Sequence, residues 1–212
     1  MLPRMVEATA LVLAGGQSRR MGRDKRFLRV EGETLLQRTF DLARAACKEV
    51  QVLISQSDEK ARILEALEIE SPSGVGKPPI LTDQSPGSGP LTAVLEAAAQ
   101  CRTQWVLVLA VDYPALTSGF LQGLLKRAQA LDQDEFALVP RCQGQLQYAC
   151  ALYRRQALIG LAQESDPPTS FRSWLSGAEG LVAWTEAEWT RFAPSGALVN
   201  WNRPADWNGP GA

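Results

Sequence analysis

The sequence predicts an α/β fold with a mostly parallel sheet, because short apolar runs alternate with longer helical patterns from residue 9 to about residue 140. One of these runs, at residues 105–110, is apolar throughout, which is typical of a central strand covered on both faces. The chain has 212 residues and 45% of them are apolar, enough for one sizeable core. We therefore expect a single domain over residues 1–212.

The first half of the chain contains two predicted strands and two predicted helices. Residues 9–13 form an apolar run that ends abruptly in two glycines, which predicts a strand followed by a loop. Apolar residues at helical spacing predict a helix over residues 35–47. A second strand is expected over 50–54, followed by a helix over 59–67.

The second half begins with a loop over residues 71–79, which are rich in Ser, Pro and Gly. A short strand follows over 79–82, and an alanine-rich helix over 91–100 leads to the central strand at 105–110. One more helix and two more strands are then expected, at residues 116–131, 136–140 and 147–152.

The charge and cysteine content narrow the class of protein. The net charge is −1 at neutral pH, so there is no global basic field for binding nucleic acid. No apolar run reaches membrane-spanning length, and the first residues do not resemble a secretory signal. The four cysteines are widely spaced, which disfavours a zinc site and fits free thiols. We expect a cytoplasmic protein without a nucleic-acid or membrane partner.

Histidine is absent from the chain, which restricts the possible chemistry. Imidazole general-base catalysis, Ser-His-Asp triads and histidine metal sites are all excluded. A metal would have to be held by oxygen ligands, which favours Mg²⁺ or a similar hard cation.

The segment after the first predicted strand is rich in glycine and strongly basic. Six of the 22 Lys and Arg residues lie within residues 15–29, together with one acid, Asp24. Glycines let backbone N–H groups approach a ligand, and the cations supply charge. This combination favours a polyphosphate site over a solvated basic loop.

A second candidate segment follows the strand at 105–110. Ligands of parallel sheets bind at the carboxyl ends of the strands, so this segment should lie near the glycine loop. Its carboxylate, Asp112, can hold a metal that bridges nucleotide phosphates. The alternative is an acid placed at the start of the next helix.

Two common phosphate motifs do not match the glycine loop. A Walker A loop needs four residues between its glycines and a Lys after the second, but five residues separate Gly16 from Gly22, and Arg23 follows. A dinucleotide fingerprint needs Gly-x-Gly-x-x-Gly at the start of a helix, whereas Gly15 and Gly16 are adjacent and charged residues follow. A dehydrogenase is therefore disfavoured.

Residues 13–25 read LAGGQSRRMGRDK. They match every specified position of the signature LAGGxSxRMGxDK, so the chain resembles the molybdenum-cofactor guanylyltransferases and their nucleotidyltransferase relatives. Three further segments agree in order and rough spacing: TDQ at 82–84 with GPL at 89–91, VDYPAL at 111–116, and NWNRPAD at 200–206. The resemblance spans nearly the whole chain. It implies a three-layer α/β/α fold with a Rossmann-like sheet, as in nucleotide-diphospho-sugar transferases.

The resemblance also implies a set of nucleotide-binding residues: Leu13, Ala14, Gly15, Gly16, Lys25, Asp83, Gly89 and Asp112. Lys25 and Arg19 would contact the triphosphate and stabilise the charge of the transition state, and Asp112 would ligate Mg²⁺. Asp83 has the alternative role of an acid in the turn before Pro86.

Asn200 and Asn202 would lie on the acceptor side of the site, although asparagine pairs are also common in turns. Residues 8–115 would form the nucleotide-binding part and residues 116–212 the acceptor-binding part. Relatives often carry a His-Pro step near residues 147–154 and an asparagine after the second strand. This chain lacks the former, and Ser55 or Gln56 stands near the place of the latter.

The activity implied by the resemblance is transfer of GMP from GTP to the terminal phosphate of molybdopterin, with Mg²⁺ as cofactor. Transient contacts with proteins that deliver molybdopterin and mature molybdoenzymes would follow. Gly16 resembles the GTP users, because cytidine-using relatives carry LAAG in place of LAGG. The alternatives are cytidylyl transfer to molybdopterin, nucleotidyl transfer to a sugar phosphate, and a non-catalytic nucleotide-binding protein.

Overall fold

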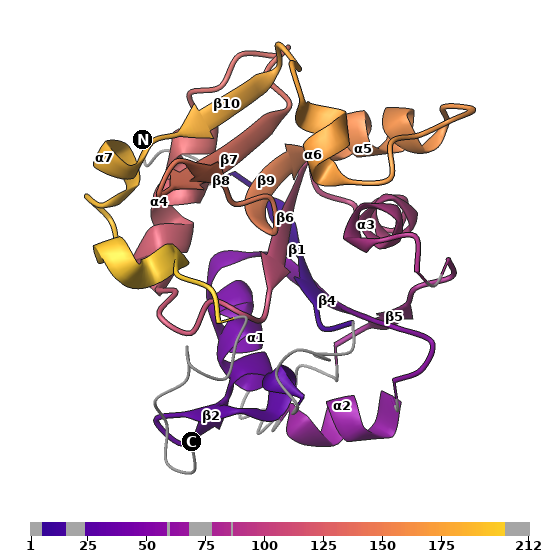
Figure 1. Cartoon of the computed structure of the whole chain (residues 1–212), viewed down its shortest axis with the longest axis vertical. Helices are drawn as coiled ribbons and strands as arrows, with labels where there is room; N and C mark the ends of the chain where they lie inside the picture. Colours follow the sequence, from indigo (N-terminus) through magenta and orange to yellow (C-terminus); the bar gives the residue numbers. More distant parts are fainter. Residues whose placement is uncertain (1–5, 16–23, 59, 68–77, 86, 202–212) are drawn as a thin grey trace.

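The computed structural model describes residues 6–15, 24–58, 60–67, 78–85 and 87–201. In this part of the chain an eight-stranded sheet has the order β10-β7-β9-β6-β1-β4-β5, with β8 paired to β7 (Figure 1). Its strands are β1 Ala8–Leu13, β4 Glu49–Ile54, β5 Ile80–Thr82, β6 Trp105–Ala110, β7 Ala137–Cys142, β8 Gln145–Leu146, β9 Cys150–Arg154 and β10 Leu181–Trp184. A separate hairpin pairs β2 Arg29–Val30 with β3 Glu33–Thr34.

The helices alternate with the strands along the first half of the chain. They are α1 Leu35–Ala46, α2 Lys60–Ala66, α3 Pro90–Ala98, α4 Ser118–Ala128, α5 Arg155–Ala162, α6 Phe171–Leu175 and α7 Glu186–Trp189, with 3₁₀ turns η1 Lys25–Phe27 and η2 Ser195–Leu198. Side-chain caps fix where two of them begin. Thr34 accepts the Gln37 N–H before α1, and Thr117 accepts the Phe120 N–H before α4. In the described residues, no helix is both long and apolar enough to cross a membrane.

Strand direction explains where a ligand can bind. β1, β4, β5 and β6 are parallel, with Leu13 in register with Leu53 on one side and Ala110 on the other. β9 is antiparallel to both β6 and β7, and β10 is parallel to β7. The sheet is mixed but mostly parallel, as predicted. The carboxyl ends of β1, β4, β5 and β6 meet at one edge, where ligands of such sheets bind.

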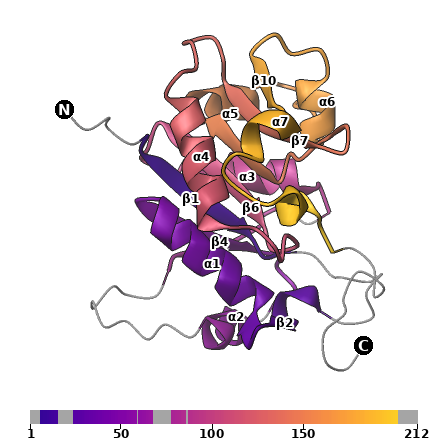
Figure 2. The ribbon, with the colours of Figure 1, turned by 90° about the vertical axis from the view of Figure 1, so that its left-hand side faces the viewer.

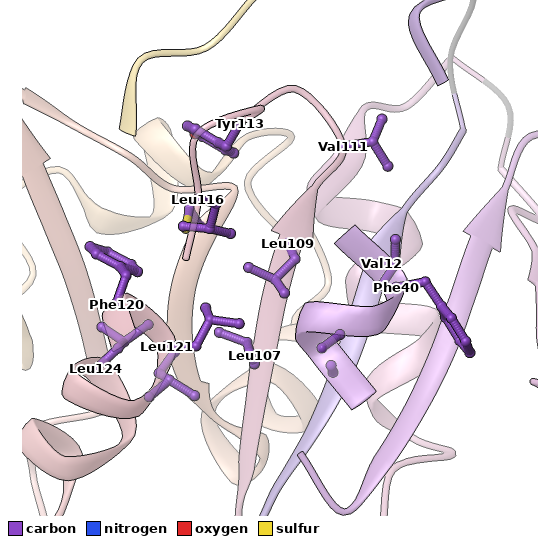
Figure 3. Close-up of a cluster of buried hydrophobic side chains, with 14 of the residues drawn as sticks. Val12, Phe40, Leu107, Leu109, Val111, Tyr113, Leu116, Phe120, Leu121 and Leu124 are labelled. Carbon is purple, nitrogen blue, oxygen red and sulfur yellow. The ribbon is translucent and has the colours of Figure 1, made fainter. Parts of the chain in front are cut away.

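Helices cover both faces of the sheet. Side chains alternate along β1, so that Val12 belongs to the cluster that contains Phe40 of α1 and Phe120 of α4, while Leu11 faces the layer of α3, α5 and α6. Figure 2 shows α1 and α4 on one face of the sheet. Figure 3 shows their apolar side chains meeting those of β6. The three-layer α/β/α architecture predicted from the sequence is confirmed.

Each element predicted from the sequence is present, with ends that differ by at most three residues within the described ranges. The largest correction concerns the last predicted strand, 147–152, because β9 begins only at Cys150. Gln147 precedes it in a turn, and its carbonyl accepts the Cys150 N–H at 3.0 Å. α4 begins at Ser118 rather than at 116 because Thr117 is its cap. Most of the predicted loop 71–79 lies outside the described residues.

The segment after α7 returns across the α4 face to the edge of the sheet. A Cβ atom on Gly123 of α4 would lie 2.5 Å from the Phe192 ring, so only glycine leaves room for this crossing. The segment then reaches Trp201, whose side chain packs against Leu28 and Leu35. The backbone N–H of Trp201 donates to the carbonyl of Asp112 at 2.8 Å. This contact ties the loop after β6 to the segment after η2.

Candidate active site

A cavity of about 630 Å³ opens at the carboxyl ends of the four parallel strands. Its walls include the last residues of β1, β4 and β6, which are Leu13, Ile54 and Ala110. Five of the residues predicted to bind nucleotide line it together: Leu13, Gly15, Lys25, Asp83 and Gly89. The volume is in the ordinary range for a small-molecule ligand.

The glycine after β1 allows two strand ends to approach each other closely. The Ala14 N–H donates to the Leu53 carbonyl at 2.8 Å, which continues the pairing of β1 with β4. A Cβ atom on Gly15 would lie 3.0 Å from the Ser55 backbone nitrogen and 3.2 Å from the Ile54 carbonyl carbon. Gly15 therefore keeps the cavity wall intact where these two segments touch.

We expect Gly15→Ala to lower the free energy of unfolding by about 1–2 kcal/mol, because the new methyl group would push against the backbone at Ser55. Nucleotide affinity should fall with it, since both segments line the cavity. Denaturant unfolding and calorimetric titration measure the two effects. The control is Gly160→Ala, because that Cβ atom on α5 would meet nothing within 4 Å. Equal behaviour of the two variants would contradict the role of Gly15.

Lys25, which lines the cavity, forms an ion pair with Asp112, which is next to the lining residue Val111 but does not itself line the cavity. Lys25 Nζ lies 3.0 Å from Asp112 Oδ2, and their side chains are 22% and 13% exposed. Lys25 is carried by η1, which Asp24 caps by accepting the Arg26 N–H at 3.2 Å. Asp112 Oδ1 is buried and has no hydrogen-bond partner among the described residues. The structure thus brings together the two residues on which the predicted chemistry depends.

Arg26 ties the segment around η1 to the turn after β4. Its Nη1 donates to the Ala14 carbonyl, its Nε donates to Asp24 Oδ1 at 2.8 Å, and its Nη2 lies 2.8 Å from Asp58 Oδ1. Burial lowers the pKa of the guanidinium, but the bonds to Asp24 and Asp58 outweigh it, so that pKa lies above its usual value. Arg26 therefore stays charged while 7% exposed.

Asp58 in turn orders the segment that contains Ser55. Its Oδ2 accepts both the backbone N–H and the hydroxyl of Ser55, each at 2.8 Å. Burial raises the pKa of Asp58, but the bonds from Arg26 and Ser55 prevail and the pKa lies below its usual value. Ser55 and Ser57 line the cavity, whereas Gln56 is exposed. Of the two residues suggested for the family's asparagine, Ser55 is thus the one in place.

Asp83 and Gly89 lie on the wall that follows β5. The Asp83 N–H donates to the Ile54 carbonyl at 2.9 Å, and the side chain accepts the Ser85 N–H at 2.9 Å. Asp83 therefore has the turn role considered above and also lines the cavity. Gly89 has a φ of 90° before Pro90, the first residue of α3, a conformation that favours glycine.

The opposite wall contains the segment that differs from the family pattern. The Ala110 N–H donates to the Ala149 carbonyl at 2.7 Å, and Ala149 lines the cavity. The Tyr113 hydroxyl donates to Gln147 Oε1 at 3.1 Å, and burial raises the pKa of that phenol well above its usual value. Asn200 is half-buried next to Trp201, which contacts the Asp112 loop. These contacts join the residue 147–149 turn to the loop that carries Asp112.

The remaining predicted residues, Gly16, Arg19 and Asn202, lie outside the described part of the chain. Conversely, the structure adds Arg26 and Asp58 to the site, which the sequence pattern did not single out. Arg26 is adjacent to Lys25 in the basic segment, and Asp58 follows a predicted strand end. Neither position by itself predicts the ion pair between the two residues.

The sequence model of the MobA-like NTP transferase domain matches residues 10–181 of the chain. The chain belongs to this family. The MobA-like resemblance read from residues 13–25 is therefore confirmed. A protein of Synechococcus elongatus named "Probable molybdenum cofactor guanylyltransferase" is 33% identical over 206 residues, which cover 93% of this chain and 95% of the relative.

Two solved structures share the MobA-like fold. A nucleotidyl transferase from Methanothermobacter has a TM-score of 0.70 at 18% identity, covering 94% of each chain. Molybdopterin-guanine dinucleotide biosynthesis protein A from Archaeoglobus fulgidus has a TM-score of 0.64 at 20% identity, covering 93% of this chain and 94% of that one. At these identities the likeness establishes the fold class, which agrees with the prediction from the sequence.

Proposed function

We propose that this MobA-like chain is a Mg²⁺-dependent guanylyltransferase that transfers GMP from GTP to the terminal phosphate of molybdopterin. The observation that carries the proposal is the ion pair between Asp112 and Lys25, a residue that lines a nucleotide-sized cavity. The printed names of the relatives support the choice of nucleotide and acceptor. The proposal includes a cytoplasmic location and transient contacts with proteins that deliver molybdopterin and mature molybdoenzymes.

The reaction is a nucleotidyl transfer. An oxygen of the acceptor phosphate attacks the α-phosphorus of GTP and forms a new P–O bond. The bond from that phosphorus to the bridging oxygen of the β-phosphate breaks, and pyrophosphate leaves. The attacking phosphate is already an anion near neutral pH, so no strong general base is needed, which suits a chain without histidine.

Catalysis then depends on positioning and on charge. Lys25 would contact the phosphates, because it lines the cavity and its ammonium group lies 3.0 Å from Asp112. The ammonium would stabilise the negative charge that builds up on the transferred group. Gly15 and the strand ends next to it line the cavity and would present backbone groups to the nucleoside.

Asp112 has the properties of a Mg²⁺ ligand. Its buried Oδ1 atom has no partner among the described residues, and a carboxylate oxygen is the donor that Mg²⁺ prefers. The described residues contain no group of three or more His, Cys, Asp or Glu side chains that could hold a metal. Asp112 would therefore hold the ion together with phosphate oxygens and water, as is usual for Mg²⁺ with nucleotides. The bound ion would supply neutralisation of phosphate charge.

The acceptor would approach from the wall formed by residues 147–149 and the C-terminal segment. The Tyr113–Gln147 bond holds this wall against the loop of Asp112, so an acceptor bound there would lie next to the phosphates. Asn200 stands on the same side, next to Trp201.

A nucleotide panel tests the proposed function. With molybdopterin and Mg²⁺, GTP should give pyrophosphate and the guanine dinucleotide, and chelation of the metal should stop the reaction. CTP serves as the control and should give less than about a tenth of the GTP rate, because the two bases present different hydrogen-bonding edges. Turnover with CTP but not with GTP would contradict guanylyl transfer and support cytidylyl transfer. Turnover with neither would favour a sugar-phosphate acceptor or a nucleotide-binding protein.

A further inference from the structure

A chain of hydrogen bonds leads from Arg26 to the edge of the nucleotide cavity. Arg26 Nη2 lies 2.8 Å from Asp58 Oδ1, and Asp58 Oδ2 accepts the Ser55 hydroxyl at 2.8 Å. The Ser55 and Ser57 hydroxyl oxygens are 3.0 Å apart. Ser55, Ser57 and Arg26 line the cavity and Asp58 does not, and the side chains of Arg26 and Asp58 are only 9% and 8% exposed.

The proton positions in this chain are fixed by elementary hydrogen-bond chemistry. An ionised carboxylate can only accept, so the single proton of the Ser55 hydroxyl is committed to Asp58. The bond between the two serines must then use the proton of Ser57, with Ser55 as the acceptor. Ser57 is left with lone pairs but no proton for a ligand. Ser57, the exposed end of this series of hydrogen bonds, is therefore an acceptor.

Arg26 fixes the direction of these hydrogen bonds by keeping Asp58 ionised. The guanidinium contacts Asp24 and Asp58 and stays charged in a buried position, which favours the ionised form of Asp58. The backbone N–H of Ser55 also donates to Asp58, so a second bond holds this carboxylate against the turn after β4. Arg26 lines the cavity, but its guanidinium nitrogens bond to Asp24, Asp58 and the Ala14 carbonyl, so its effect on the serines passes through Asp58.

We propose that Ser57 accepts a hydrogen bond from an N–H or O–H donor of the bound nucleoside, and that Arg26 and Asp58 are positioning residues that set its polarity. The inference rests on the proposed function, because it takes the nucleotide to bind in this cavity. Asp83 lines the same cavity and adds a second acceptor. Phosphates, which are themselves acceptors, would be repelled by these groups and attracted to Lys25.

The chemistry of the donor defines the class of ligand. Guanosine offers an exocyclic amine, a ring imino N–H and two ribose hydroxyls. Each is missing from one available analogue of GTP: ITP lacks the amine, the 2-aminopurine nucleotide lacks the imino N–H, and 2′-deoxy-GTP and 3′-deoxy-GTP each lack a hydroxyl. If one of these groups donates a hydrogen bond to Ser57, the analogue that lacks that group should bind with the same affinity whether or not the serine hydroxyl is present.

The test measures equilibrium binding of these five nucleotides by calorimetric titration, with Mg²⁺ and without acceptor. Ser57→Ala should weaken GTP binding about fivefold, the usual contribution of one neutral hydrogen bond. The analogue that lacks the matching donor should bind both proteins equally. Ser57→Thr, which keeps the hydroxyl, should restore GTP binding and is the matched control.

Asp58→Asn tests the positioning role. An amide can donate as well as accept, so the polarity of the serines is no longer fixed and GTP affinity should fall by a similar factor. Because both substitutions act on one chain of bonds, the double variant should bind GTP no more weakly than the worse single variant. Thermal unfolding confirms that each variant folds, and the ratio of GTP to analogue affinity is a readout that a purely structural role would not change.

The outcomes separate this inference from the proposed function. GTP binding that Ser57→Ala leaves unchanged, or an equal loss for all five nucleotides, would overturn the role of Ser57 alone. Fully additive effects of Ser57→Ala and Asp58→Asn would overturn the positioning role of Asp58. If the wild-type chain binds none of the nucleotides, both the proposed function and this inference fail.

Discussion

Replacing Asp112 by asparagine is expected to lower kcat for guanylyl transfer by about a thousandfold. The reason is that the protein would lose the carboxylate proposed to bind the metal ion that neutralises the phosphates. An amide keeps the shape of the side chain but removes the charge. Asp112 Oδ1 is buried and without a partner among the described residues, so the carboxylate is available where the phosphates would arrive. Asp112→Ala should abolish turnover. Initial rates at saturating GTP and Mg²⁺ measure both effects.

The fold should tolerate these substitutions. Trp201 contacts the backbone carbonyl of Asp112 rather than its side chain, so the link between the C-terminal segment and this loop remains. Asp166→Asn is a suitable control because it removes one charge at an exposed position. Thermal unfolding of all three variants should resemble that of the wild type. A variant of Asp112 that keeps more than a third of the wild-type kcat would show that the metal is held elsewhere.

The first half of the fold was predictable because its signals are local. The apolar runs at β1 and β6 are long enough to be buried on both faces, and the glycines after Leu13 mark where the first strand must end. Parallel pairing then follows from the alternation of strands and helices. With that pairing, the loops that carry Lys25 and Asp112 have to meet at one edge of the sheet. The contact between these two residues follows from topology.

The second half of the fold was less predictable, because the order of its strands in the sheet depends on pairing between strands that are far apart in the sequence. β9 lies between β6 and β7 and is antiparallel to both, a placement that no local pattern specifies. The helices α5, α6 and α7 are short, and β10 has only four residues, so their periodicity is too brief to recognise. Two of the tryptophans of this region have a packing role, since Trp184 and Trp189 are buried against Phe120.

The partners of Arg26 illustrate the same limit within the site. Arg26 stands among five other basic residues in the segment 15–29, and the sequence does not indicate which of them is buried. Only the packing of η1 against the turn after β4 shows that Arg26 faces Asp58. The sequence alone allows a polyphosphate site or a solvated loop for the basic segment, and Arg26 shows a third role, a buried cation that bonds to Ala14 and Asp58.

Lys25→Met is expected to lower kcat/KM by about a hundredfold or more, because the transferred phosphate would lose its nearest cation. The methionine side chain has a similar length and leaves the 3₁₀ turn intact, since Asp24 caps that turn through the backbone of Arg26. Most of the loss should appear in kcat, since charge builds up on the transferred group only in the transition state. Steady-state rates at varied GTP, with fixed Mg²⁺ and molybdopterin, separate kcat from KM.

The Lys25 prediction can be separated from a general effect of charge. Lys126→Met is the matched control, because Lys126 is exposed on α4 and its loss changes the net charge equally. Pairing with Asp112 at 3.0 Å gives Lys25 a second role, since it neutralises that carboxylate before the nucleotide binds. If pairing were its whole role, Asp112→Asn with Lys25→Met would be no slower than Asp112→Asn alone. A further loss in the double variant is expected, because the lysine would still contact the phosphates after the carboxylate is gone.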